Sequence, residues 1–363
     1  MKNKKSFDQM LFAVALILSV FGLIMVFSAS SPAALALEND SFHYVKKQAI
    51  WAVLGIFVML FCSRIDYRIY KKWAVLMSVV SNVLLALVLV IGNSAKGAQR
   101  WLGVGSISFQ PSEFTKIAIV VALATYFAAM EGKKQNFKNI YLPLITILGI
   151  PCILLLLQPH FSIIIILGFV TFILMMVYKV KLRFYLPVIV VVLIAAVALV
   201  WVAPYRLQRI TAYRNPFADP QGDGYQIIQS LFAIGSGGFG GLGLSRSRQK
   251  YLYIPEPQND YIFSIVCEEL GFIGALLVLV LFMVFLWRSV KIAVNARDSF
   301  GSYLAFGLCM LIIVQVALNI LVVTNLIPPT GIPLPFFSAG GSAFIFQMVA
   351  VGIILNISKT SNK

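Results

Sequence analysis

Ten long apolar segments recur along the chain and constrain its fold more than any other feature. A helix needs about 20 mostly apolar residues to cross a bilayer. Only 12% of the residues are charged, whereas soluble domains carry roughly a quarter. The chain is therefore predicted to be an all-α polytopic membrane protein, folded as a single membrane domain over residues 1–363. The ten predicted transmembrane helices are Met10–Phe27, Val45–Cys62, Trp73–Ile91, Glu113–Met130, Ile140–Leu157, Phe161–Tyr178, Phe184–Pro204, Ile262–Trp287, Gly301–Ile327 and Ser342–Ile357.

The distribution of Lys and Arg predicts the orientation of these helices. With the N-terminus inside, the inner segments hold 18 Lys and Arg residues, and the short outer loops hold 4. Because inner loops of membrane proteins are enriched in these residues, both termini are predicted to be cytoplasmic, in the cytoplasmic membrane. The net charge of +16 is then explained by inner loops and anionic membrane lipids, and no nucleic-acid partner is expected.

Two outer segments hold much of the remaining polar or irregular sequence. The first, residues 205–261, is a long extracytoplasmic loop between the seventh and eighth helices. Its six cations suit phosphate recognition, although anionic lipid headgroups would attract them equally well. The second segment, residues 328–342, is rich in Pro and Gly and carries no charge, which predicts a short, re-entrant or cavity-lining loop. The six cations are Arg206, Arg209, Arg214, Arg246, Arg248 and Lys250.

Ionisable residues near the outer helix ends are the candidates for chemistry. Glu113 and Lys116 lie three residues apart on one predicted helix, so they form either a structural ion pair or a polar cavity that binds an anion. Asp260 precedes the eighth helix, where it is either a helix N-cap or a catalytic carboxylate. His160 is either a proton carrier or a hydrogen-bonded structural residue at a turn, and the second interpretation is favoured. The four Cys and two His residues show no metal-ligand spacing.

Four blocks of sequence together resemble the SEDS family of shape, elongation, division and sporulation proteins, which includes FtsW, RodA and SpoVE. The blocks are GAQRWLGVGSISFQPSEFTK, RITAYRNPFADPQGDGYQIIQSLFAIGSGGFGGLGL, YIPEPQNDYIFSIVCEELGFIG and TGIPLPFFSAGGSA. Their order and their spread over nearly the whole chain make the resemblance specific, and the second and third blocks are closest to the FtsW/SpoVE branch. The chain departs from the usual family pattern at His160, where an aspartate is common.

The resemblance implies a peptidoglycan glycosyltransferase that polymerises lipid II at the outer face of the membrane. Its expected partners are lipid II, the nascent lipid-linked glycan and a class B penicillin-binding protein that acts as transpeptidase. Division, elongation and sporulation all remain open as the cellular role. Alternatives of a different class are a lipid II flippase and a non-catalytic scaffold for the transpeptidase.

The resemblance also implies the site residues. The family's essential outer aspartate falls on Asp260, the expected general base of an inverting transfer. Substrate binding is expected from Arg100, Glu113, Lys116 and Arg209, which match family motifs, and also from Arg246, Arg248 and Ser338. No cofactor is required by this scheme, and a divalent metal ion is a second source of positive charge for the leaving pyrophosphate.

Overall fold

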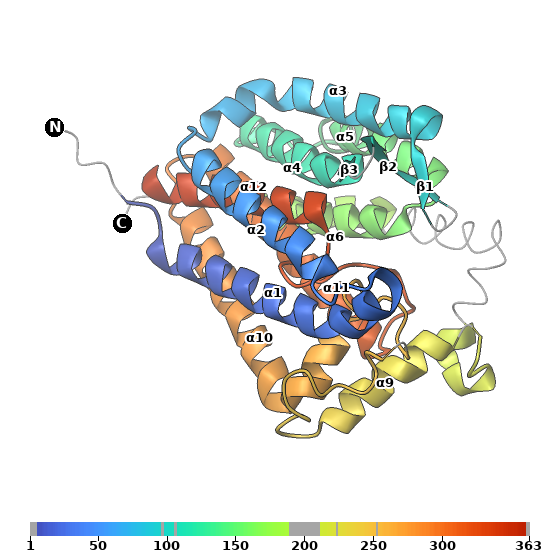
Figure 1. The fold of residues 1–363 in the computed structure, drawn as a ribbon. Helices are drawn as coiled ribbons and strands as arrows, with labels where there is room; N and C mark the ends of the chain where they lie inside the picture. Colours follow the sequence, from blue (N-terminus) through green and yellow to red (C-terminus); the bar gives the residue numbers. More distant parts are fainter. Residues whose placement is uncertain are drawn as a thin grey trace.

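The protein is a bundle of long helices with a small sheet at one end, as the computed structural model in Figure 1 shows. The structure describes residues 6–95, 98–104, 107–188, 211–222, 224–251 and 253–360. Its elements are α1 (Gln9–Glu38), α2 (His43–Cys62), α3 (Arg68–Ile91), β1 (Asn93–Ala95), β2 (Ala98–Val104), β3 (Ile107–Phe109), α4 (Pro111–Met130), α5 (Phe137–Leu157), α6 (Phe161–Val177), the 3-10 turns η1 (Leu182–Phe184) and η2 (Pro216–Ala218), α9 (Tyr225–Gly237), α10 (Ile262–Val294), α11 (Ser299–Val323) and α12 (Gly341–Thr360).

The helix composition agrees with a multi-pass membrane protein. Among the described residues, eight helices are long and apolar enough to cross a membrane, and the apolar helix α6 is shorter, with 17 residues. The seventh predicted span, Phe184–Pro204, falls largely on residues 189–204, which lie outside the described residues. The mostly helical fold is therefore confirmed, and the count of ten spans stays a prediction.

The expectation of a purely α-helical chain is wrong at the connection between α3 and α4. Strands β1, β2 and β3 form an antiparallel sheet in that order. Backbone donors and acceptors need partners, and short strand pairing supplies them in a connection that does not form a helix. Figure 1 shows this sheet at the end of the bundle opposite the start of α1 and the end of α12. The start of α1 and the end of α12 are joined by a hydrogen bond of 2.9 Å from Asp8 N to Ser358 Oγ.

Several helices extend beyond the predicted apolar spans. Helix α1 continues to Glu38, and α10 continues to Val294, because hydropathy marks only the apolar part of a helix. Helix α10 is kinked at Gly271, whose φ of 64° and ψ of −162° leave the helical region. A Cβ atom at Gly271 would lie 2.3 Å from the backbone nitrogen of Gly241. Glycine is thus required where α10 bends around the segment that follows α9.

The segment predicted as one long outer loop also contains a helix. Residues 225–237 form α9, which packs against the first part of α10. Its last residue, Gly237, accepts a hydrogen bond from Gly241 N at 2.8 Å, so the chain turns back sharply. The turn brings residues 241–250 along the α10 backbone.

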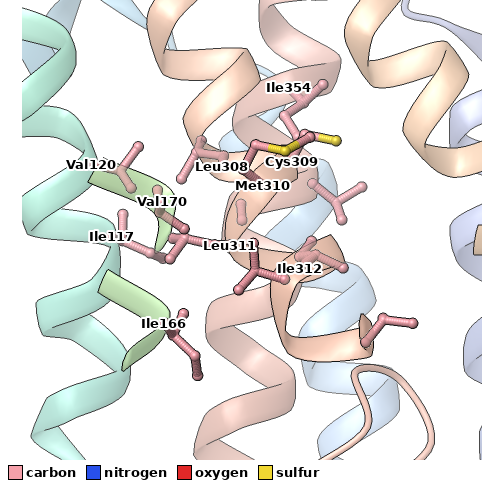
Figure 2. Close-up of a cluster of buried hydrophobic side chains, with 14 of the residues drawn as sticks. Ile117, Val120, Ile166, Val170, Leu308, Cys309, Met310, Leu311, Ile312 and Ile354 are labelled. Atoms are coloured by element: carbon pink, nitrogen blue, oxygen red, sulfur yellow. The ribbon is translucent and has the colours of Figure 1, made fainter. Parts of the chain in front are cut away.

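Four helices meet in the hydrophobic core shown in Figure 2. Buried aliphatic side chains of α4 and α6 interlock with those of α11 there, and Ile354 of α12 closes one side. Helices α4, α11 and α12 are therefore mostly buried in protein, whereas less than a third of the apolar part of α2, α3 and α5 is buried. The labelled residues are Ile117, Val120, Ile166, Val170, Leu308, Cys309, Met310, Leu311, Ile312 and Ile354.

The segment between α11 and α12 is irregular and deeply packed. Residues 324–340 contain no helix or strand, yet Phe336 and Phe337 are fully buried. The Phe336 ring lies 6.0 Å from that of Phe285 on α10, and Phe337 lies 5.3 Å from Phe21 on α1. Both partners stand well inside their helices, which is the packing expected of a re-entrant loop. Its depth in a bilayer stays a prediction.

Candidate functional site

Asp260 stands directly before α10, but it does not cap that helix. Helix α10 begins at Ile262, and its N-cap residue is Tyr261, which makes no side-chain cap. Asn259 uses its amide elsewhere, with Nδ2 donating to Oε2 of Glu256 at 2.7 Å. The N-cap interpretation of Asp260 is therefore wrong, because Tyr261 occupies that position. Asp260 itself is half-buried.

Three consecutive backbone carbonyls hold the Asp260 segment in place. Ala339 N donates to the carbonyl oxygen of Gln258 at 2.8 Å. Ser338 Oγ donates to that of Asn259 at 2.6 Å, and Asn319 Nδ2 donates to that of Asp260 at 2.7 Å. Ser338 Oγ also accepts a bond from Leu334 N at 2.7 Å. The irregular segment after α11 and the helix α11 itself thus fix the backbone next to the carboxylate.

Gly331 approaches the carboxylate of Asp260 from the same irregular segment. A Cβ atom at Gly331 would lie 3.1 Å from Oδ2 of Asp260, and the φ of Gly331 is +65°. A residue with a side chain would be strained there and would crowd the carboxylate. The absence of a side chain at residue 331 therefore keeps space beside Oδ2.

Glu113 and Lys116 form a buried ion pair at the start of α4. Lys116 Nζ lies 2.9 Å from Glu113 Oε2, and each residue is only 4% exposed. Pro111 at the first helical turn sets the start of α4, so that the two side chains share one helix face at i and i+3. The predicted pairing is confirmed, and the role of either residue in substrate binding stays a prediction.

Arg100 and His160 lie near this ion pair. Arg100, on β2, donates from its guanidinium to the carbonyl oxygens of Gln158 and Pro159, in the turn between α5 and α6. His160 follows in that turn, and burial together with the nearby charges of Arg100 and Lys116 lowers its pKa from 6.5 to about 3. The imidazole is therefore neutral at physiological pH. Its Nδ1 atom is buried without a hydrogen-bond partner among the described residues.

The turn between α5 and α6 is linked to the segment that carries Gly331. Ser162 Oγ donates to the carbonyl oxygen of Thr330, the residue before Gly331. The structure therefore connects the group of Arg100, Lys116 and His160 to the surroundings of Asp260. Residues from β2, α4, the α5–α6 turn and the segment after α11 converge here, although they are far apart in the sequence.

A second charged cluster lies where the segment after α9 meets α10. Lys250 Nζ lies 2.9 Å from Glu269 Oε1, and the side chains are only 2% and 0% exposed. Ser28 of α1 donates to the same carboxylate at 2.6 and 2.7 Å. Glu268 accepts bonds from Ser247 Oγ and from Arg248 N, the latter at 2.8 Å. Lys250 was expected to recognise phosphate with its neighbours, but its ammonium group is committed to Glu269.

The remaining predicted cations divide into exposed and undescribed residues. Arg246 and Arg248 are exposed on the turn after α9. Arg248 lines a cavity of about 380 Å³ together with Leu231, Phe232, Gly235, Ser236, Gln249 and Glu268. Arg209 lies outside the described residues.

Metal-binding side chains do not gather in the described parts of the chain. Within those ranges, no three His, Cys, Asp or Glu side chains come together as a potential metal site. The donor set around Asp260 therefore offers a metal ion few protein ligands, and metal dependence stays a prediction of the sequence. The four cysteines are free thiols.

The sequence interpretation missed Asn319 and assigned Lys250 to the wrong role. Asn319 is a neutral amide within an apolar helix, and attention to charges alone passes over it. Lys250 was grouped with the arginines because sequence position does not reveal burial. A polar side chain in an otherwise apolar span is the signal that would have identified Asn319.

Comparison with known proteins identifies relatives over the full chain. Residues 8–363 match the family described as cell cycle protein, which groups FtsW, RodA and SpoVE. Stage V sporulation protein E of Bacillus subtilis (strain 168) is 42% identical over 361 residues, covering 99% of each chain. A probable peptidoglycan glycosyltransferase FtsW of Trichlorobacter lovleyi is 41% identical over 354 residues, covering 97% of this chain and 93% of that protein.

Solved structures share the fold. A chain of a peptidoglycan synthase complex, described as coordinating polymerization and crosslinking, superposes with a TM-score of 0.80 at 27% identity, covering 97% of both chains. The rod shape determining protein RodA of Thermus thermophilus superposes with a TM-score of 0.73 at 24% identity, covering 98% of both chains. At that identity, the second likeness shows the fold alone.

Proposed function

The chain belongs to the SEDS family of cell cycle proteins, in the FtsW/SpoVE branch, and on that premise we propose that it polymerises lipid II with Asp260 as general base. Glycosyltransferase activity is supported by full-length relatives named as peptidoglycan glycosyltransferases, at 38% and 41% identity. The multi-pass membrane location agrees with the eight long apolar helices in the described parts of the chain.

The observation that carries the proposal is that the backbone of Asp260 is held by hydrogen bonds while space remains beside its carboxylate. Its backbone carbonyl is hydrogen-bonded by Asn319, and the backbone just before it is held by Ser338 and Ala339. Its carboxylate faces the residue that lacks a side chain, Gly331. A carboxylate held on a fixed backbone with space beside it is suited to accept a proton from a bound hydroxyl.

The proposed reaction is one in-line displacement. The 4-hydroxyl oxygen of the acceptor sugar attacks the anomeric carbon of the donor, and Asp260 takes the hydroxyl proton. The bond between the anomeric carbon and the lipid pyrophosphate breaks, and the pyrophosphate leaves with the bonding electrons. An α-linked donor then gives a β-linked product, as a general-base carboxylate does in inverting glycosidases.

The leaving pyrophosphate carries negative charge that must be stabilised. Arg100 and Lys116 are the proposed source near the α5–α6 turn, with Glu113 orienting Lys116 through their 2.9 Å ion pair. Arg209, Arg246 and Arg248 are proposed to contribute from the segment between residues 205 and 261. Ser338 is proposed to act mainly through its bond to the Asn259 carbonyl, because that contact already uses its proton.

A class B penicillin-binding protein is the proposed partner. The support is the fold shared with a chain of a complex that coordinates polymerization and crosslinking. A transpeptidase held beside the polymerase would receive glycan strands as they emerge. Lipid II and the growing lipid-linked glycan would reach the site laterally from the bilayer, between the apolar helices.

A polymerisation assay tests this function. It combines the purified full-length chain with lipid II and a cognate transpeptidase in detergent or liposomes. We expect glycan polymer on a denaturing gel from the chain with its partner, and none when the chain is omitted. Transport of a fluorescent lipid II across liposomes without polymer would favour a flippase instead. Binding of the transpeptidase with neither polymer nor transport would identify a scaffold.

A further inference from the structure

We propose that Asn319 is a positioning residue for Asp260, joining the candidate base and the irregular segment after α11 into one unit; this rests on the proposed function. Asn319 lies on α11 and is fully buried. Its Nδ2 atom donates to two backbone carbonyls at once, that of Asp260 at 2.7 Å and that of Ile332 at 2.7 Å. A single side chain therefore bridges the two backbone segments that meet beside the carboxylate.

The chemistry of the two partners fixes the orientation of the amide. Carbonyl oxygens only accept hydrogen bonds, so the NH₂ group of Asn319 must face them, and its Oδ1 must point away. The Oδ1 atom is buried with no partner among the described residues. Leaving a buried acceptor unsatisfied destabilises the fold. Asn319 is therefore a poor choice for packing alone, and its donors are the group that the site uses.

The bridge links the segment before α10 to the irregular segment after α11, and both lie beside the Asp260 carboxylate. Ile332 follows Gly331, whose missing side chain keeps space beside Asp260 Oδ2. Ser338 and Ala339 bind the two carbonyls before Asp260 from the far end of the same segment. Loss of the Asn319 bridge would free the Asp260 carbonyl and the Gly331 turn together. Because small displacements of a catalytic group reduce the rate strongly, the expected cost is in turnover.

Gln315 provides a matched control on the same helix. It is a buried amide one turn earlier, 2% exposed, and within the described parts of the chain its Nε2 donates only to the Leu311 carbonyl of its own helix at 2.9 Å. Gln315→Leu therefore removes a buried amide from α11 without touching the Asp260 segment. Asn319→Leu removes the bridge with similar volume, and Asn319→Asp keeps the shape while replacing the NH₂ donors with oxygen.

The first test measures polymerisation of lipid II by the full-length chain with its transpeptidase partner. We expect Asn319→Leu and Asn319→Asp to lower kcat by about tenfold to a hundredfold, with KM for lipid II within twofold of the unsubstituted chain. Gln315→Leu should keep both parameters within twofold. Unchanged kcat in the Asn319 variants would overturn the positioning role while leaving the proposed function standing. A matching loss in Gln315→Leu would also overturn it, because the effect would then be general to buried amides.

The second test measures the bridge without the reaction, by hydrogen exchange in peptides that cover residues 258–264 and 328–340. Both segments should exchange faster in the Asn319 variants than in the unsubstituted chain or Gln315→Leu. Unchanged exchange would overturn the bridge. If the unsubstituted chain makes no polymer, the proposed function fails and the bridge is judged by exchange alone. If neither Asn319 variant folds while Gln315→Leu does, the residue is structural and the inference is wrong.

Discussion

The carboxylate of Asp260 and the backbone of Gly331 are in direct proximity: a Cβ atom at residue 331 would lie 3.1 Å from Oδ2. This places an irregular, uncharged segment against the candidate base, 71 positions away in sequence by their residue numbers. The segment therefore shapes the space in which an acceptor hydroxyl would have to sit.

Gly331→Ala should lower polymerisation about tenfold or more, because the added methyl group crowds Oδ2 and the φ of +65° strains an alanine. Initial rates of polymer formation measure the effect. Gly132→Ala is the matched control: its φ is +75°, and its Cβ would meet nothing within 4 Å. Equal rates for Gly331→Ala and the unsubstituted chain would contradict the proposed access to Asp260.

Removing one partner of the Glu113–Lys116 pair should destabilise the protein by about 3–5 kcal/mol, because the other charge is left buried. Thermal unfolding of Glu113→Gln and Lys116→Met in detergent measures this loss. The double variant should recover most of the stability but not the polymerisation, since the cation is proposed to bind the substrate. Recovery of both would assign the pair a structural role only.

Lys250→Met should destabilise the protein by about 3 kcal/mol or more, because Glu269 would remain buried without its counter-charge. Arg248→Met, at an exposed position two residues earlier, should change the free energy of unfolding by about 0.5 kcal/mol or less. Unfolding temperatures of the two variants make the comparison, and Lys250→Met with Glu269→Gln should be more stable than Lys250→Met. Equal effects at the two positions would contradict the buried ion pair.

Acid should destabilise the protein through His160. Its pKa is 6.5 as an unperturbed group and about 3 in the fold, where burial disfavours the imidazolium. Below about pH 6.5 His160 binds a proton in the unfolded chain but not in the folded chain. The free energy of unfolding therefore falls as the pH drops towards 3. The expected loss is about 2 kcal/mol at pH 5. His160→Gln should lack this component in thermal unfolding between pH 5 and 7.5, and an identical pH slope would refute it.

The sequence predicted the parts of the fold that hydropathy records. The long apolar helices, the start of α4 and the Glu113–Lys116 pair follow from composition, a proline at the first turn and i, i+3 spacing. The helix ends were less accurate, because α1 and α10 continue beyond the predicted spans into segments that mix small, apolar and polar residues. The small sheet was missed, since its strands of 3 to 7 residues give only a weak pattern.

The sequence predicted the charged residues of the site, but not the contacts between residues that lie far apart in the sequence. Asp260, Glu113 and Lys116 were identified from scarcity of charge and from family motifs. The bond from Asn319 to the Asp260 carbonyl joins α11 to the segment before α10, and the Lys250–Glu269 pair joins the segment after α9 to α10. Such contacts come from tertiary packing, which spacing along one chain does not encode.

The most direct test of the central claim is the polymerisation of lipid II by the Asp260→Asn variant. Asparagine keeps the shape of the side chain but does not act as the base, so polymer formation should fall by about 10²–10⁴-fold, with lipid II binding and unfolding temperature unchanged. The unsubstituted chain with the same transpeptidase partner provides the reference rate. Polymer formed by Asp260→Asn at that reference rate would contradict the account.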